Sequence, residues 1–170
     1  MHRVQFQTRI RWYEDIEQRP IVYLDESGFA VDAPRMHGYS HTGSRCYGQH
    51  DWHEKGRLNA IGAILAFELI TIELWDCNID ADVFFAWVRN ALLPSTPMQS
   101  VVVMDNATFH KRSDIIHAIE EEGHTVEFLP SYSPDLNPIE KKWAQAKAQR
   151  RRRRCTPFEL FSSAQIYAGL

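Results

Sequence analysis

Residues 101–105 read Val-Val-Val-Met-Asp, and residues 21–25 read Ile-Val-Tyr-Leu-Asp. Each is a short apolar run that ends in an acid, which is typical of a buried strand whose end faces solvent. We therefore predict two buried strands that stop at Asp105 and Asp25. If they are neighbours in one sheet, both acids emerge at the same edge of it.

Downstream of Asp105 the sequence predicts a helix and another strand. Ser113 is expected to cap a helix that runs through Glu122, and Gly123 to close it. Residues 125–128 then form a strand. Two strands joined by a helix are parallel, so this part of the sheet is predicted to be parallel.

Upstream of this unit the sequence predicts three antiparallel strands in a meander. Residues 21–24 form the first, and residues 57–65 and 69–74 form the other two. Residues 28–52, between the first two strands, are rich in Gly, His, Ser and Tyr. We expect a twisted hairpin or an irregular loop there.

One predicted helix crosses the sheet after the meander. Its apolar residues recur at helical spacing over residues 81–92. Asn78 or Asp80 is expected to cap it, and Pro94 to end it.

A last helix follows the Pro-rich turn at 130–138, with Asn137 as its N-cap and Pro138 at its first position. The layout is therefore three antiparallel strands, a helix, a parallel strand–helix–strand unit and a final helix. We predict an α/β fold of the RNase H-like class, with a five-stranded mixed sheet flanked by helices.

The composition is that of one soluble globular domain: 170 residues, of which 44% are hydrophobic and 24% charged. The three cysteines, Cys46, Cys77 and Cys155, have no paired spacing, so neither a disulfide framework nor a zinc site is indicated. Neither a signal peptide nor an apolar run long enough to span a bilayer is visible. We expect a cytoplasmic protein and no membrane partner.

Charge is distributed unevenly along the chain. The formal net charge is −3, yet residues 141–154 contain eight Lys or Arg and no acid. Acids dominate residues 114–127. A local basic segment can bind phosphates despite an acidic total. The alternative for the basic segment is a solvated helix end, because cations also suit a helix C-terminus.

Asp25, Asp105 and Glu140 are the candidate metal ligands. Enzymes that use two metal ions on phosphodiesters need several carboxylates from elements far apart in sequence, and carboxylate oxygens suit Mg²⁺ or Mn²⁺. Each acid also has a structural interpretation. Asp25 can be a turn residue, Asp105 can form an Asx-turn, and Glu140 stands at the capping-box position after Asn137.

Three motifs resemble a known family. They are Leu-Asp-Glu-Ser-Gly-Phe at 24–29, Met-Asp-Asn-Ala-Thr-Phe-His-Lys at 104–111, and Tyr-Ser-Pro-Asp-Leu-Asn-Pro-Ile-Glu at 132–140. They are similar to the signatures of the DDE transposases of mariner-like bacterial insertion sequences, in the retroviral-integrase superfamily. The 34 residues between Asp105 and Glu140 match the separation characteristic of this group.

The resemblance covers residues 21–154 and implies a catalytic domain there, after an N-terminal extension at 1–20 and before a tail at 155–170. It implies Asp25, Asp105 and Glu140 as a catalytic triad that binds two Mg²⁺ or Mn²⁺ ions. The implied reaction on double-stranded DNA is hydrolysis at the transposon ends. Attack of the freed 3′-OH on target DNA follows, usually at a TA dinucleotide.

Four polar residues near the triad are assigned other roles. Asp135 is interpreted as a structural residue of the turn. Glu26, if the strand continues, points to the face opposite Asp25, where a supporting role in the site is open. Asn106 is expected to stabilise a turn, and His110 either orients the site or starts a helix.

DNA contacts are expected from basic residues on and after the last helix and from the loop after the first strand. The loop carries Arg35, Gly38, Tyr39 and Arg45, which resemble a family region near DNA, and its histidines at 37, 41, 50 and 53 are expected to be exposed rather than zinc ligands. The residues predicted to bind DNA are Arg35, Lys141, Lys142, Lys147, Arg150, Arg151, Arg152, Arg153 and Arg154.

Partners follow from the resemblance. Family members carry N-terminal helix-turn-helix modules, whereas only about twenty residues precede the first strand here. We expect an upstream DNA-binding half supplied separately, or a truncated remnant, and a possible homodimer. The alternatives to a working transposase are an inactive DNA-binding regulator and an RNase H-type nuclease that cleaves RNA–DNA hybrids.

Overall fold

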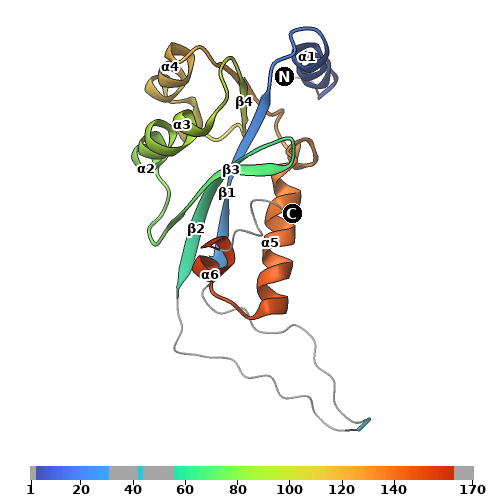
Figure 1. The fold of residues 1–170 in the computed structure, drawn as a ribbon, viewed down its shortest axis with the longest axis vertical. Coiled ribbons are helices and arrows are strands. Elements are labelled where there is room, and N and C mark those ends of the chain that lie inside the picture. The colour runs from blue at the N-terminus through green and yellow to red at the C-terminus, as the bar shows by residue number, and fades with distance from the viewer. Residues whose placement is uncertain (1–2, 31–41, 44–55, 163–170) are drawn as a thin grey trace.

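The structure is a computed structural model that describes residues 3–30, 42–43 and 56–162 (Figure 1). Its helices and strands in chain order are α1 (Arg3–Asp15), β1 (Ile21–Ala30), β2 (Arg57–Leu65), β3 (Glu68–Trp75), α2 (Ala81–Trp87), the π-helical turn η1 (Val88–Leu92), α3 (Leu93–Ser95), β4 (Val101–Met104), the 3₁₀ turn η2 (Phe109–Lys111), α4 (Ser113–Glu121), β5 (Thr125–Phe128), the 3₁₀ turn η3 (Pro134–Leu136), α5 (Ile139–Arg153) and α6 (Pro157–Ser162).

The five strands form one mixed sheet in the order β3-β2-β1-β4-β5. β1 pairs with β2, and β2 with β3, in antiparallel register, whereas β4 lies parallel to β1 and β5 parallel to β4. The predicted five-stranded sheet is therefore confirmed, and β1 is its central strand. At ten residues β1 is longer than predicted, because it pairs with β2 as far as Ala30.

The register between β1 and β4 aligns the two candidate aspartates. Ile21 pairs with Val101 and Tyr23 with Val103, a constant offset of 80 residues. The same offset, continued by two residues, places Asp25 next to Asp105. Because the strands are parallel, both acids leave the sheet at the same end.

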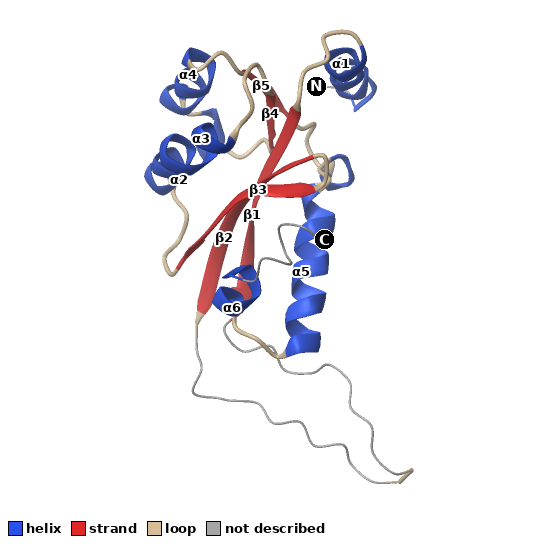
Figure 2. Ribbon diagram, viewed as in Figure 1, coloured by secondary structure: helices blue, strands red, loops and turns tan. Residues whose placement is uncertain are grey.

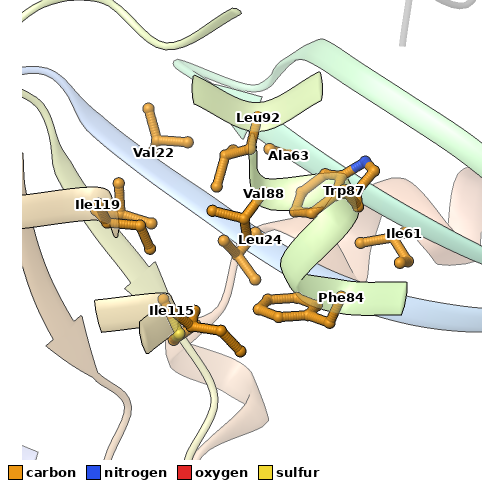
Figure 3. Packing of buried hydrophobic residues seen from close by; sticks show 12 residues of the cluster. Val22, Leu24, Ile61, Ala63, Phe84, Trp87, Val88, Leu92, Ile115 and Ile119 are labelled. Carbon is orange, nitrogen blue, oxygen red and sulfur yellow. The ribbon is translucent and has the colours of Figure 1, made fainter. Parts of the chain in front are cut away.

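The two faces of the sheet have separate cores, since side chains alternate along each strand. One face carries Val22 and Leu24 under the helical segment α2–η1 and under α4. Figure 3 shows this packing, with Phe84 and Trp87 over the strands and with Ile115 and Ile119 beside Leu24. This cluster fixes the α2 and α4 side of the molecule (Figure 2).

The opposite face carries α5 and α1. Trp143 and Ala146 of α5 pack on Ala60 and Ile64 of β2, and α6 closes this cluster with Leu160 and Phe161. Phe6 and Ile10 of α1 pack against Ile21, Val101 and Val103. Asp25 and Asp105 are in phase with Ile21, Tyr23, Val101 and Val103, so by alternation they project toward the face that carries α5.

Residues 1–20 and 155–170 contain helices that the sequence analysis did not predict. α1 has only two buried residues, Phe6 and Ile10, and α6 is six residues long. Neither has the long apolar periodicity that makes a helix visible in a sequence. Both are defined by their contacts with the sheet.

The end of the helix after β3 was predicted wrongly. Asp80 caps α2, as predicted, by accepting hydrogen bonds from the backbone N–H groups of Asp82 and Val83. Pro94, however, does not end the helix, which continues to Ser95. The turn before it is π-helical, with the N–H of Leu93 bonded to the carbonyl of Val88 five residues earlier. This wider turn makes room for a ring that would clash in an α-helix.

Two predicted caps are also displaced by one residue. The N-cap of α4 is Arg112 rather than Ser113, and its extended backbone makes the turn without a side-chain cap. The N-cap of α5 is Pro138 rather than Asn137. Asn137 instead donates from Nδ2 to the carbonyl of Leu24 at 3.4 Å, so its amide links the start of α5 to β1.

Candidate active site

One pocket of about 430 Å³ brings the three predicted acids together. Its lining residues are Asp25, Asp105, Asn106, Ala107, Leu129, Pro130, Ser131, Tyr132, Ser133, Pro134, Asn137 and Glu140. These described residues include three carboxylates and no Lys, Arg or His. The pocket lies where β1 and β4 end and α5 begins, so three elements far apart in sequence each supply one acid.

Asp25 is the most perturbed of the three. Burial, together with the negative charges of Glu26, Glu140 and Asp105, raises the pKa of the Asp25 carboxyl to about 7. A pKa near neutrality indicates a carboxyl in a partly dry, negatively charged environment. This is the environment that a bound divalent cation would neutralise.

Asp105 is held by two hydrogen bonds to one oxygen. Its Oδ1 accepts from the backbone N–H of Ala107 at 2.9 Å and lies 2.5 Å from Nδ1 of His110. The hydrogen bond from His110 lowers the pKa of Asp105. The Asx-type turn that was the structural alternative is thus present, and it leaves Oδ2 for a further ligand.

His110 joins Asp105 to Glu26. The imidazole is fully buried against the rings of Phe84 and Phe109, with centroids 4.4 and 4.3 Å away. Its Nε2 lies 2.8 Å from Oε1 of Glu26. Burial alone would lower the pKa of His110, but the hydrogen bonds to Asp105 and Glu26 outweigh it and raise this pKa to about 9.

His110 therefore carries both ring protons at neutral pH and donates to both carboxylates. Glu26 faces away from the pocket, as the strand alternation predicted, and it touches the site only through His110. Of the two roles considered for His110 in the sequence, the structure places it in contact with the site. A histidine that orients a metal-binding carboxylate is a common supporting arrangement.

Glu140 reaches the pocket from the first turn of α5. The side chain is exposed, and its backbone N–H donates to the carbonyl of Asn137 at 3.2 Å. Asn137 is buried and bonded to the carbonyl of Leu24, the residue before Asp25. The position of the helix start, and with it that of Glu140, is tied to the end of the apolar part of β1.

The donor set fits a divalent cation of the Mg²⁺ or Mn²⁺ type. All the acidic ligands are hard oxygens, and Oδ1 of Asn137 is a further buried oxygen without a hydrogen-bond partner in the described structure. As the side chains stand, no three acids, histidines or cysteines among the described residues converge closely enough to hold one ion. Glu140 is exposed, so its side chain is free to turn toward the two aspartates.

The basic residues predicted to bind DNA fall into two groups. Lys141 and Arg151–Arg154 are exposed, whereas Lys142 and Arg150 are each only 5% exposed. Arg150 donates from Nε to the carbonyl of Cys155, which secures the chain after α5. Buried cations do not reach a phosphate without repacking, so the burial of Lys142 and Arg150 argues against their predicted role.

The remaining predicted positions are divided between the surface and the undescribed loop. Nζ of Lys147 lies 5.5 Å from the ring centre of Phe29, on the face of the sheet that α5 covers. Arg35, Gly38, Tyr39, Arg45 and the four loop histidines lie outside the described residues.

Asp135 and Asn106 hold the loops around the pocket. Asp135 does not line the pocket, and its carboxylate pairs with the guanidinium of Arg3 at 2.9 and 2.5 Å. Nδ2 of Asn106 lies 3.4 Å from Oγ of Ser131. The sequence analysis missed Arg3, because no local pattern indicates a contact with a residue 132 positions away.

Carboxylates at the ends of two adjacent parallel strands, with a third on the following helix, define the catalytic edge of an RNase H-like fold. The sheet order and the helices on both faces agree with this class. A model of the DDE superfamily endonuclease family matches residues 20–159. The chain belongs to this family.

Solved structures of Mos1 transposase share the fold. The Mos1 transposase paired-end complex with the left transposon end superposes with a TM-score of 0.70 and 18% identity, over 87% of this chain and 47% of the Mos1 chain. The mariner Mos1 paired-end complex with Mg gives 0.68 and 19%, over 86% and 47%. The Mos1 catalytic domain with Raltegravir and Mg gives 0.57 and 18%, over 89% and 76%.

These similarities set the scale of the chain against its structural relatives. It spans about half the length of the Mos1 chains in the paired-end complexes. A comparison with curated proteins finds no match. None of the helices in the described part of the chain combines the length and apolar character that crossing a membrane requires.

Proposed function

We propose that this chain is a transposase catalytic domain that cleaves DNA strands and transfers them to a target, with divalent metal ions as cofactors. The observation that carries the proposal is the convergence of Asp25, Asp105 and Glu140 on one pocket in a DDE-family chain. The Mos1 complexes solved with Mg and with Mn favour these two metals.

The proposed reaction has two steps. In the first, the oxygen of a water molecule attacks phosphorus at the transposon end and the bond to the 3′ oxygen breaks, leaving a 3′-OH and a 5′-phosphate. In the second, that 3′-OH attacks a target phosphorus and displaces the 3′ oxygen of the target strand. Two bound metal ions would supply activation of the attacking oxygen and stabilisation of the leaving oxygen.

The chain's own residues supply binding and orientation. Asp25, Asp105 and Glu140 would hold the ions, and the charge of Asp105 is maintained at neutral pH by His110. Buried Asn137 fixes the start of α5 and so limits where Glu140 can lie. The exposed Lys141 and Arg151–Arg154 are proposed to contact phosphates beside the cleaved bond.

Recognition of transposon ends is proposed to need more than this domain. Mos1 is seen as a paired-end complex, and that suggests two catalytic domains acting together. We propose a homodimer and a helix-turn-helix segment that reads the ends, supplied within a longer chain or by a separate product.

The test is nicking of duplex DNA that carries the terminal repeats flanking the gene, with Mg²⁺ or Mn²⁺ and with any upstream reading frame supplied in trans. Asp105→Ala is expected to abolish cleavage, and Glu120→Gln is the matched control because Glu120 is an exposed acid of α4 outside the pocket. The proposal fails if the wild type binds the ends but does not cut them with either metal.

Two further outcomes separate the alternatives. DNA binding without cleavage, equal in the wild type and Asp105→Ala, would support a regulator that competes for transposon ends. Cleavage of an RNA–DNA hybrid in preference to duplex DNA would support an RNase H-type nuclease.

A further inference from the structure

Tyr132 stands out on the wall of the catalytic pocket. Its side chain is 99% exposed, although it lines the same pocket as the three carboxylates. Its backbone has φ of +56°, in the left-handed region that residues other than glycine rarely adopt. A large aromatic residue is thus held in a disfavoured backbone conformation without any packing of its ring.

The turn that carries Tyr132 is held on both sides. Oγ of Ser131 accepts from Nδ2 of Asn106 at 3.4 Å, and Oγ of Ser133 accepts from the guanidinium of Arg3 at 2.9 Å. The hydroxyl of Ser133 also donates to the carbonyl of Ser131 at 3.3 Å. Pro130 is buried. The neighbours of Tyr132 are therefore fixed while its own ring projects into solvent.

Stability does not account for a tyrosine at this position. Glycine or asparagine would adopt the same backbone with less strain, and a polar residue would suit full exposure better. Strained residues at a functional site are generally kept for binding or catalysis. The ring lies beside the acids, where a nucleic acid strand would have to pass to be cleaved.

We propose that Tyr132 stacks on the face of an unpaired base next to the phosphate that enters the carboxylate pocket. Aromatic side chains bind single-stranded nucleic acid by stacking on bases, and this contact tolerates any sequence because every base has a π-face. A base inside a duplex has both faces covered by its neighbours. The contact therefore requires a base that has left the stack, at a frayed end or a distorted step.

This inference rests on the proposed function and adds a binding site for one nucleotide to it. The phenol ring is expected to provide the contact, and the hydroxyl group is not needed. The inference thus predicts a specific order among variants: phenylalanine retains binding, whereas alanine and glycine lose it.

The test compares full-length wild type, Tyr132→Phe, Tyr132→Ala and Tyr132→Gly. The probe is a short duplex with a single-stranded overhang that contains 2-aminopurine, a base whose fluorescence is quenched when an aromatic ring stacks on it. A blunt duplex of the same length is the reference DNA. Thermal unfolding of each variant is measured in parallel, and Tyr132→Gly is expected to be at least as stable as the wild type because it relieves the backbone strain.

The expected result is quenching by the wild type and Tyr132→Phe, and none by Tyr132→Ala or Tyr132→Gly. Affinity for the overhang is expected to fall roughly 5- to 100-fold in the last two, with affinity for the blunt duplex unchanged. Equal quenching by all four proteins would overturn the inference. So would loss of quenching in Tyr132→Phe, or equal weakening on both DNAs.

The same proteins separate this inference from the proposed function. If the wild type cuts DNA with Mg²⁺ but the four proteins quench alike, the catalytic proposal stands and the stacking site is refuted. If quenching depends on the ring but no cleavage is found with either metal, the stacking site stands and the catalytic proposal is refuted.

Discussion

Replacing Asp25 with asparagine should stabilise the protein when no metal is present. The wild-type carboxyl must ionise above neutral pH in a partly buried pocket beside three other acids, and its pKa is raised to about 7 as a result. Asparagine has nearly the same shape and no charge. The substitution therefore removes an unfavourable ionisation while leaving the packing of β1 unchanged.

The size of the effect follows from the pKa shift. A rise from 3.8 to about 7 corresponds to about 4 kcal/mol once the group is ionised in both the folded and unfolded states. The pocket is open to water, which screens the charges, so we expect roughly half of this, about 2 kcal/mol. For a domain of this size that raises Tm by about 4–8 °C.

The pH dependence has a defined sign. Between about pH 4 and 7 the folded protein keeps a proton on Asp25 that the unfolded chain has already lost. The free energy of unfolding of the wild type therefore falls, relative to that of Asp25→Asn, as pH rises through this range. Above about pH 7 both states have lost the proton, and the difference between the two proteins is constant.

The assay is thermal or urea unfolding of both proteins in EDTA at intervals from about pH 4 to 8. Asp105→Asn is the matched control, and it should destabilise the protein, because the charge of Asp105 is favoured by its hydrogen bond from His110. Adding Mn²⁺ should stabilise the wild type more than Asp25→Asn. An Asp25→Asn protein no more stable than the wild type at about pH 8, or a difference that does not change between about pH 4 and 7, would refute the reasoning.

Three further substitutions test other parts of the structure. His110→Ala should lower both DNA cleavage and the affinity for Mn²⁺, measured by thermal shift, roughly 10- to 100-fold, because Asp105 loses the group that orients it; unchanged Mn²⁺ affinity would argue against this role. Gly62→Ala should destabilise the protein by about 1–3 kcal/mol in urea unfolding, because the added Cβ would lie 2.8 Å from Cη2 of buried Trp143; unchanged stability would show that this ring moves easily. Replacing the exposed Arg151–Arg154 with glutamine should flatten the salt dependence of DNA binding by about one unit of slope for each phosphate that the variant no longer binds, and an unchanged slope would place the DNA elsewhere.

Local sequence was sufficient for most of the sheet. The apolar runs at 101–104 and 125–128 form strands with the predicted bounds, as do residues 57–65. The acids that end two of the buried runs mark the edge where the pocket lies. These features could be predicted because backbone hydrogen bonding and the alternation of side chains depend on neighbouring residues.

Helix ends were predicted less well. Pro94 lies within the helical segment, because a π-helical turn makes room for its ring. Asn137, a good N-cap by type, is drawn instead to the carbonyl of Leu24. In both cases packing against the sheet outweighs a local preference of about 1–3 kcal/mol.

The sequence by itself determined which residues form the strands, which face each one presents and where the acids of the site emerge. Only the tertiary structure decided that His110 would join Asp105 to Glu26, that Arg3 would pair with Asp135, and that two of the basic residues of α5 would be buried. The physical reason is the range of the interactions. Strand periodicity depends on adjacent residues, whereas a side-chain contact between distant segments depends on how the helices pack over the sheet.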